Sequence, residues 1–346
     1  MKRRYFPPEW FAQSAVQLTF PHKNSDWATM LVEAEKCFIR IIETIANFEK
    51  VLVVCADVQY VQSLINKKYH PQIVFVALES NDTWSRDHGG ITVYEDENPV
   101  ILDFIFNGWG MKFAANHDNL ITQKLFQKNI FSKNVRHESI PFVLEGGSLE
   151  TDGNDTLLTT TECLLSQNRQ AHLSKQKITS LLKKYLGVQK VIWLTHGYLA
   201  GDDTDSHIDT LARFADAKTI MYVRCDDKKD EHYSALKKME AQLKKATDLY
   251  NAPYKLVALP MCTACFDAEG NRLPATYANF LIINDAVLVP TYNIPEDELA
   301  LEIFRKHYTH KKVTGIDCRV LIEQHGSLHC VTMQYPKEII GSLVNS

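Results

Sequence analysis

The sequence predicts an α/β fold, in which helices and strands alternate along the chain and pack in layers. Two observations predict it. Runs rich in β-branched residues are interleaved with amphipathic helical patterns throughout the 346 residues. Polar, glycine-rich clusters follow several of these strand-like runs, so we expect the functional residues in loops after strands.

Helical patterns occur in three segments where apolar residues recur three and four positions apart among charges. These segments are residues 27–48, 174–185 and 231–249, and the last two are typical of exposed helices. Strand-like runs fill much of the remaining chain, at residues 50–55, 73–78, 100–106, 156–161, 190–194, 219–223, 254–259, 280–283, 286–290 and 312–316. No Gly/Ser-rich or Pro-rich linker divides them, so we expect one domain over residues 1–346.

The composition is that of a soluble globular protein, with 45% hydrophobic and 23% charged residues. The formal net charge is −4 and the charges are mixed along the chain, which argues against nucleic acid or an anionic membrane as a partner.

No apolar stretch approaches the roughly 18 residues of a membrane-spanning helix. The basic start at residues 1–4 is followed by Pro7, Pro8 and Glu9 instead of the apolar run of a signal peptide. Eight cysteines, several of them in apolar runs, suit the free thiols of a reducing compartment, so we expect a cytoplasmic protein.

Four polar clusters recur at a regular spacing. From Asp87 to Glu145 is 58 residues, from Glu145 to His207 is 62, and from His207 to Cys330 is 123, about twice that step. This spacing predicts modules of about 60 residues with one functional loop each, the less obvious fourth loop lying at residues 266–274. Five such modules nearly fill the chain, which suggests a closed ring whose loops converge on one central pocket.

Cys330 is a candidate nucleophile. It ends the polar segment Gln324-His-Gly-Ser-Leu-His-Cys330, where His325 and His329 provide the polar setting that lowers a thiol pKa from about 8.5. A buried structural thiol is the other interpretation, and the spacing favours neither. Cys262 and Cys265 form a single CxxC pair, which we interpret as structural because zinc ribbons need a second ligand pair.

The segment Gly201-Asp-Asp-Thr-Asp-Ser-His-Ile-Asp209 has four carboxylates and one histidine in nine residues. It could be a solvated turn with capping aspartates. If His207 and Asp209 lie on a strand, however, they point to the same face, where a base and an anion would share one wall. The Asp-x-His-x-Asp spacing also occurs in metal-dependent ureohydrolases, but these need a second aspartate cluster, and the acidic residues at 226–230 are typical of surface charge.

Together the clusters offer one thiol, one imidazole, one aromatic ring at Trp84 and three carboxylates, Asp87, Glu145 and Asp209. Three anions around a thiol suit a cationic substrate. A guanidinium is a planar cation with five N–H donors, so two aspartates can hold its edge while a thiolate attacks its carbon.

The sequence resembles the agmatine deiminase branch of the guanidino-modifying pentein superfamily, which is related to bacterial peptidylarginine deiminases. The resemblance covers nearly the whole chain through Phe20-Pro21-His22, Trp84-Ser-Arg-Asp87, Phe106-Asn-Gly-Trp-Gly110, Glu145-Gly-Gly-Ser148, Leu157-Leu-Thr-Thr160, Cys163-Leu-Leu, Asn168-Arg169, Gly201-Asp-Asp-Thr-Asp205 with His207 and Asp209, Tyr277, Asn279-Phe280, Val289-Pro290 and His329-Cys330. The family fold is a propeller of five ββαβ-type modules around a pseudo-fivefold axis, in agreement with the spacing.

The resemblance implies roles for the candidate residues. Cys330 is the expected nucleophile, His207 the acid and base, and Glu145 the partner that orients His207. Asp87 and Asp209 are the expected guanidinium ligands, with Trp84 lining the pocket. The sequence departs from the family pattern at Gly90, Gln170, Ser206 and in the segment before Cys330, where Gln324, His325 and Ser327 replace a glycine-rich run. Less glycine there could stiffen the loop that presents the thiol.

We therefore expect hydrolysis of agmatine to N-carbamoylputrescine and ammonia in putrescine biosynthesis, through a covalent thiouronium intermediate and with no cofactor or metal. The expected partner is this small guanidino substrate, and a homo-oligomer is compatible with the resemblance. The alternatives are an arginine or peptidylarginine deiminase, a metal-dependent ureohydrolase that releases urea, and a non-catalytic guanidine- or polyamine-binding protein.

Overall fold

The structure is a computed structural model that describes residues 4–170 and 172–341, so the first three residues of the basic start lie outside it. The described strands form six separate sheets. Five of them have three or four strands, and each of these contains an antiparallel pair next to a parallel pair. The α/β class expected from the sequence is confirmed.

The five larger sheets follow one another along the chain. The first contains β19, β2, β3 and β4 (Met333–Pro336, Gln13–Thr19, Lys50–Cys55 and Ile73–Ala77). The second contains β1, β5, β6 and β7 (Arg4–Tyr5, Ile91–Glu95, Asn98–Ile105 and Arg136–Val143). The third contains β8, β9 and β10 (Glu150–Thr151, Thr156–Thr160 and Lys190–Leu194). The fourth contains β11, β12 and β13 (Ala212–Asp216, Thr219–Arg224 and Lys255–Pro260). The fifth contains β16, β17 and β18 (Leu281–Ile282, Ala286–Thr291 and Lys312–Asp317). A two-stranded hairpin, β14 and β15 (Cys265–Phe266 and Arg272–Leu273), forms the sixth.

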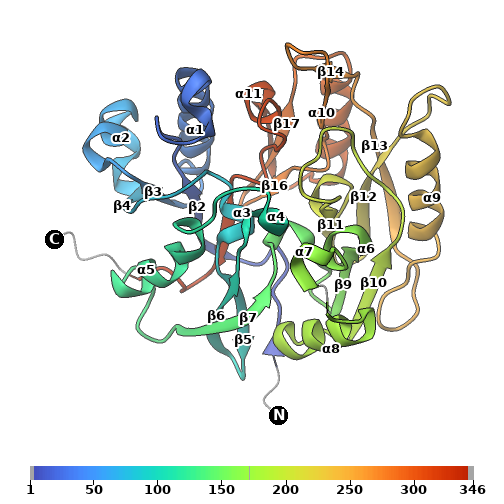
Figure 1. The fold of residues 1–346 in the computed structure, drawn as a ribbon, viewed down its shortest axis with the longest axis horizontal. Helices are drawn as coiled ribbons and strands as arrows, with labels where there is room; N and C mark the ends of the chain where they lie inside the picture. Colours follow the sequence, from blue (N-terminus) through green and yellow to red (C-terminus); the bar gives the residue numbers. More distant parts are fainter. Residues whose placement is uncertain (1–3, 171, 342–346) are drawn as a thin grey trace.

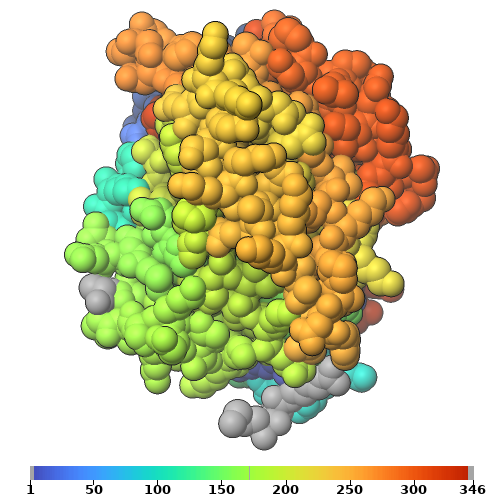
Figure 2. Space-filling view, turned by 90° about the vertical axis from the view of Figure 1, so that its right-hand side faces the viewer, coloured from blue at the N-terminus to red at the C-terminus, as the bar shows by residue number. Residues whose placement is uncertain are grey.

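The longer helices lie toward the outside of the molecule, and the shorter ones α3 and α4 lie near its middle (Figure 1). The longer ones are α1, α2, α5, α8, α9 and α10 (Leu31–Ile45, Val58–Leu64, Ile121–Gln127, Lys175–Leu186, Tyr233–Leu243 and Glu296–His307). The short ones are α3, α4, α6, α7 and α11 (Ser85–His88, Gly108–Met111, Thr161–Leu164, Gln167–Gln170 and Arg319–Ile322). Short 3₁₀ helices, η1 to η5, lie at Asp26–Met30, Lys67–Gln72, Asp118–Leu120, Gly146–Ser148 and Ile208–Thr210. Figure 2 shows the side of the molecule that α9 and its neighbouring segments cover.

The core is built from strands that are apolar on both faces. In β3, Val51 and Val53 pack into one cluster of buried side chains, and Leu52 and Val54 pack into a second cluster on the opposite face. This division follows from the two-residue period of a strand, and it explains why the sequence of β3 is a continuous apolar run. In the described part of the chain, no helix is long and apolar enough to cross a membrane.

The predicted elements are present, with changes at their ends. Residues 50–55 and 190–194 form strands with the predicted bounds. The helix expected at 27–48 begins as η1 and continues as α1 only to Ile45. Helix α8 begins after Ser174, whose hydroxyl accepts a hydrogen bond from Lys177 N, and it ends at Leu186, before Gly187, which has a left-handed φ of 81°.

Candidate active site

The candidate residues lie in the loops that connect one sheet to the next. Asp87 is in α3, between the first and second sheets, and Glu145 lies between the second and third. His207 and Asp209 lie between the third and fourth sheets, and Cys330 lies between the fifth and the first. The structure therefore brings together residues that are far apart in sequence, as the spacing predicts.

The fourth connection contributes Asn279, which the sequence reasoning missed. Its Oδ1 atom lies 3.4 Å from the Cys330 Sγ atom and accepts a hydrogen bond from His329 N at 2.8 Å. The expectation that residues 266–274 supply this loop is wrong. They form the β14–β15 hairpin, in which the Phe266 side chain is exposed to solvent.

His207 and Asp209 lie in a turn, so the condition that both lie on one strand is not met. Asp209 is within the turn η5 and His207 precedes it, because side chains of the same loop bind the backbone and hold it curved. The Asp202 carboxylate accepts a hydrogen bond from Ser206 N at 2.7 Å, and the Thr204 hydroxyl accepts one from His207 N at 3.1 Å. The two side chains nevertheless face the same site.

The Cys330 thiol is buried, and its Sγ atom lies 3.9 Å from Asp209 Oδ2. Burial, with the charges of Asp209 and Asp87, raises the thiol pKa well above its ordinary value. The expectation that neighbouring histidines lower this pKa is therefore wrong. The ring nitrogens of His329 lie 2.8 Å from Asp209 Oδ2 and 2.6 Å from Glu9 Oε2, and His325 lies at the rim of the site, 2.9 Å from the Gly201 carbonyl oxygen. Without a bound cation beside it, the sulfur is therefore a neutral thiol.

The two aspartates differ in their surroundings. Asp87 accepts hydrogen bonds from Trp109 Nε1 and Gly147 N, both at 2.9 Å, yet burial and the charge of Asp209 raise its pKa well above the ordinary value. Burial also acts to raise the pKa of Asp209, but the hydrogen bond and charge of His329 outweigh it and lower that pKa. Asp209 Oδ1 is buried without a hydrogen-bond partner among the described residues. Two carboxylates thus face the thiol, one of them with a free acceptor oxygen.

The His207 ring is fully buried, and neither of its nitrogens has a hydrogen-bond partner in the part of the chain that is described. Its Nδ1 atom lies 3.6 Å from Asp87 Oδ1. Burial lowers the pKa of His207 to about 3, so the imidazole is neutral at physiological pH. A neutral ring with two free nitrogens can accept a proton from a neighbouring group.

Glu145 does not hydrogen-bond to His207, which differs from the role that the resemblance implies. Its carboxylate accepts two hydrogen bonds from Arg169 Nε, at 2.8 and 3.0 Å, and both side chains are fully buried. Arg169 also forms an ion pair with Asp205, which in turn binds Lys112. Glu145 is therefore the inner end of a chain of charges that reaches the surface beside His207.

One group of described residues has the residue types and spacing of a possible metal site. It consists of Glu145, Cys163 and His207, whose potential ligand atoms lie within 4.8 Å of one another. The Arg169 guanidinium occupies the Glu145 carboxylate and places a permanent positive charge there. Burial and the charge of Glu145 also raise the pKa of Cys163 well above its ordinary value, whereas a metal ligand must be a thiolate. The chemistry of this group does not fit a metal centre.

Gly147 lies at the centre of the site. A Cβ atom on this residue would be 2.6 Å from His207 Nδ1, 2.8 Å from Asp87 Oδ1 and 3.1 Å from Asp209 Oδ2. These distances are shorter than ordinary van der Waals contacts. The absence of a side chain at position 147 is therefore what allows the three groups to approach one another.

A cavity of about 140 Å³ leads from the solvent to Cys330 and Asp87. Its walls include the aromatic rings of Trp84, Trp109 and Phe113 and the carboxylates of Asp26, Asp82 and Asp203. No lysine or arginine lines it among the described residues. The entrance is therefore acidic and aromatic, which suits a cation.

Trp84 is held in place from two sides. Its Nε1 atom donates a hydrogen bond to Asp82 Oδ2 at 3.0 Å, and Asp82 Oδ1 accepts one from Trp27 at the same distance. A Cβ atom on Gly326 would lie 2.2 Å from the Trp84 ring. Of the segment before Cys330, Gly326 is thus the position where a glycine is required, while His325 adopts a φ of 65° despite its side chain.

Several other residues of the site were not assigned a role from the sequence. Trp109, Arg169 and Asn279 each belong to a quoted motif, and this is the signal that could have identified them. Glu9 and His329 form a buried chain behind Asp209. All eight cysteines are free thiols, including Cys262 and Cys265.

The chain matches known proteins over nearly its full length. The profile of the Porphyromonas-type peptidyl-arginine deiminase family matches residues 5–336. A Latilactobacillus sakei protein provisionally named agmatine deiminase is 34% identical over 95% of each chain. A solved Porphyromonas gingivalis structure, provisionally named arginine deiminase, is 55% identical with a TM-score of 0.95, covering 98% of this chain and 100% of that one. A Cys-to-Ser variant of C. jejuni agmatine deiminase, solved with substrate bound, is 38% identical with a TM-score of 0.91 and 96% coverage of each chain.

Proposed function

The chain belongs to the Porphyromonas-type peptidyl-arginine deiminase family, and from this premise we propose that it hydrolyses agmatine to N-carbamoylputrescine and ammonia. The observation that carries the proposal is the set of unpartnered buried atoms around the thiol, namely Asp209 Oδ1 and both ring nitrogens of His207. Buried polar groups without partners are costly, and a guanidinium supplies the N–H donors that a free carboxylate oxygen needs. The similar agmatine deiminases support the choice of this guanidine.

The first half of the reaction forms a covalent adduct. The bound guanidinium adds a positive charge beside Cys330, which favours loss of the thiol proton to neutral His207. The thiolate attacks the guanidinium carbon while Asp87 and Asp209 hold the nitrogens. His207 then returns its proton to the departing nitrogen, the C–N bond breaks, ammonia leaves, and a cationic thiouronium remains on Cys330.

The second half releases the product. Water attacks the thiouronium carbon as neutral His207 takes one of its protons. The C–S bond then breaks, the hydroxyl proton of the adduct passes to the leaving sulfur as the ureido C=O forms, and the proton on His207 passes to solvent, which leaves His207 neutral for the next cycle. The fixed charges of Asp87 and Asp209 stabilise the cation in both halves, so positioning and electrostatics provide most of the acceleration.

The charge of the entrance favours agmatine over arginine. Agmatine has a distal ammonium that Asp26, Asp82 and Asp203 attract, whereas arginine adds a carboxylate that they repel. An arginine deiminase is the second candidate, because the solved structure that shares 55% identity has that provisional name. Peptidylarginine is a poorer fit because Cys330 is 4% exposed and Asp87 3%.

A comparison of three compounds tests the choice of substrate. We expect kcat/KM for agmatine to exceed that for arginine and for an acetylated arginine amide by at least about a hundredfold, or roughly 2.7 kcal/mol. The ureido product is measured for each compound under identical conditions. Comparable rates on arginine would assign the protein as an arginine deiminase. Release of urea, or loss of activity to EDTA with recovery on adding manganese, would support a ureohydrolase instead.

The five larger sheets are interpreted as the five modules of a single-domain pentein propeller, arranged around a pseudo-fivefold axis through the site. Their repeated pairing pattern and the site residue in each connection support this arrangement.

We also assign the protein to the cytoplasm and to putrescine biosynthesis. The eight free thiols, most of them buried, support the reducing compartment.

A further inference from the structure

A buried chain of three side chains lies behind the guanidinium site. His329 Nδ1 lies 2.8 Å from Asp209 Oδ2, and His329 Nε2 lies 2.6 Å from Glu9 Oε2. His329 is 1% exposed, Asp209 0% and Glu9 7%. Solvent therefore does not screen these contacts, and each of them is a strong interaction.

Each ring nitrogen of His329 faces a carboxylate oxygen. A neutral imidazole has one donor and one acceptor nitrogen, so it could not donate to both carboxylates. Burial acts to raise the pKa of Glu9, but Arg213 and His329 outweigh it and lower that pKa, and the pKa of Asp209 is lowered too. Two ionised carboxylates offer only acceptor oxygens, so this arrangement requires an N–H donor on each ring nitrogen of His329.

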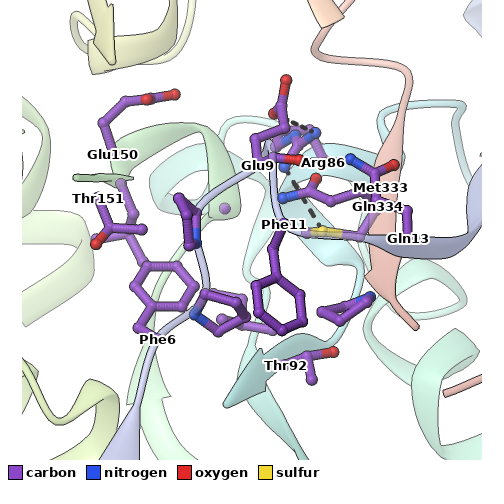
Figure 3. A pocket seen from close by; sticks show the side chains of 16 residues that line it. Phe6, Glu9, Phe11, Gln13, Arg86, Thr92, Glu150, Thr151, Met333 and Gln334 are labelled. Atoms are coloured by element: carbon purple, nitrogen blue, oxygen red, sulfur yellow. Dashed lines mark hydrogen bonds and ion pairs between the residues drawn. The ribbon is translucent and has the colours of Figure 1, made fainter. Parts of the chain in front are cut away.

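Glu9 reaches this position from the N-terminal segment that precedes β2. Its carboxylate accepts hydrogen bonds from Ile282 N at 2.7 Å and Arg213 Nη2 at 2.8 Å, and Arg86 Nη2 lies 3.5 Å away. Figure 3 shows Glu9 and Arg86 in the wall of a small cavity of about 40 Å³. None of the residues that line this cavity lines the one leading to Cys330, so Glu9 does not contact the substrate's entrance.

We propose that His329 and Glu9 are positioning residues of the catalytic site, through which the N-terminal segment keeps Asp209 ionised and aimed at the guanidinium. The inference rests on the proposed function. His329 occupies Asp209 Oδ2, which leaves Oδ1 as the oxygen available to the substrate. Glu9 supplies the second carboxylate that keeps the ring of His329 doubly protonated.

The test measures agmatine binding to the Cys330→Ser variant as a function of pH. The charged or titratable groups that face Asp209 are His329, Cys330, His207, Arg213, Arg86, Asp87 and Asp202. Replacing His329 with Gln removes the imidazolium, so the pKa of Asp209 rises and the carboxylate is protonated at a higher pH. On the acid side, agmatine binding weakens as Asp209 becomes protonated, and we call this part of the pH profile the acid limb. We expect the acid limb to move up by about one pH unit or more, and Kd at neutral pH to rise about tenfold or more.

His232→Gln in the same background is the matched control. His232 is also 1% exposed and also bonded to an aspartate, Asp230, at 2.7 Å, but it lines no part of the cavity at Cys330. A general loss of packing would weaken both variants alike, whereas the proposed role moves the acid limb only in His329→Gln. An unmoved acid limb in His329→Gln, or an equal shift in the control, would overturn the proposal.

Glu9→Gln tests the outer end of the chain. Because Glu9 acts through His329, its effect on agmatine Kd should largely disappear when His329 is already Gln, so that the two changes are not additive. Full additivity would refute the coupling. The free protein gives a readout without substrate, since ¹⁵N NMR should show both ring nitrogens of His329 protonated, and one of them unprotonated in Glu9→Gln. If agmatine is neither bound nor turned over, the proposed function fails, and these NMR spectra still decide the charge on His329.

Discussion

Gly147→Ala should separate catalysis from folding, because the added methyl group meets three functional side chains at once. The new Cβ atom would be 2.6 Å from His207 Nδ1, 2.8 Å from Asp87 Oδ1 and 3.1 Å from Asp209 Oδ2. Contacts of ordinary length begin near 3.4 Å, so these atoms must move apart by up to about 0.8 Å. A misplacement of about 1 Å costs roughly a hundredfold in rate, so we expect kcat/KM to fall about a hundredfold, or about 2.7 kcal/mol.

The atoms that meet the new methyl group are the ends of side chains, so the fold can adapt to it. We therefore expect Gly147→Ala to keep most of the wild-type thermal stability, measured by differential scanning fluorimetry alongside the kinetics. Gly341→Ala is the matched control, since the nearest atom to its Cβ would be 3.5 Å away. Gly146→Ala is the opposite case and should destabilise the protein, because its Cβ would be 2.1 Å from the Arg86 backbone oxygen. Wild-type kcat/KM in Gly147→Ala would refute the geometry described for the site.

The remaining predictions concern single groups of the site. Cys330→Ser should lose turnover but still bind agmatine by calorimetry, and substantial activity would contradict covalent catalysis. Asp87→Asn and Asp209→Asn should each cost about 1.5 to 3 kcal/mol of guanidinium binding and change kcat and KM together, and an unchanged KM in steady-state assays would argue against a clamp. Glu145→Gln breaks the buried pair with Arg169, so urea denaturation should show a loss of about 3 to 5 kcal/mol in the free energy of unfolding, and an unchanged value would show that the pair does not stabilise the fold. Burial raises the pKa of Asp87, so without substrate its ionisation lowers the stability of the protein as the pH rises above the ordinary carboxyl range. The rise in Tm that agmatine causes in Cys330→Ser should therefore grow with pH, and a constant rise would show that Asp87 does not titrate.

The sequence was sufficient to predict the α/β class and the group of loops that meet at the site. Asp87, Glu145 and His207 each belong to a polar cluster after a strand, and such clusters are visible without coordinates. Asn279 was harder to find, since it follows Thr276-Tyr-Ala and no glycine-rich signal surrounds it. Its role depends on a 3.4 Å contact with Cys330, 51 residues later, which forms only in the folded chain.

Ion pairs between residues that are far apart in sequence were also not predictable, because these contacts form only in the folded chain. Glu145 was expected to orient His207, but it binds Arg169, which follows 24 residues later in α7. Among the strands, β2 was not predicted, because its apolar pattern is interrupted by the buried polar residues Gln13 and Gln17. Gln17 Oε1 accepts a hydrogen bond from the Tyr335 hydroxyl of β19 at 2.8 Å, so a partner from the far end of the chain satisfies this buried oxygen.

The most direct test of the account is to trap the covalent adduct during turnover of agmatine. Wild-type protein is mixed with agmatine, quenched in acid at short times, and digested for mass spectrometry of the peptide that contains Cys330. We predict that this peptide carries the mass of agmatine minus ammonia, that the adduct disappears as N-carbamoylputrescine accumulates, and that Cys330→Ser shows neither. Turnover without an adduct on Cys330, or an adduct on another cysteine, would contradict the account.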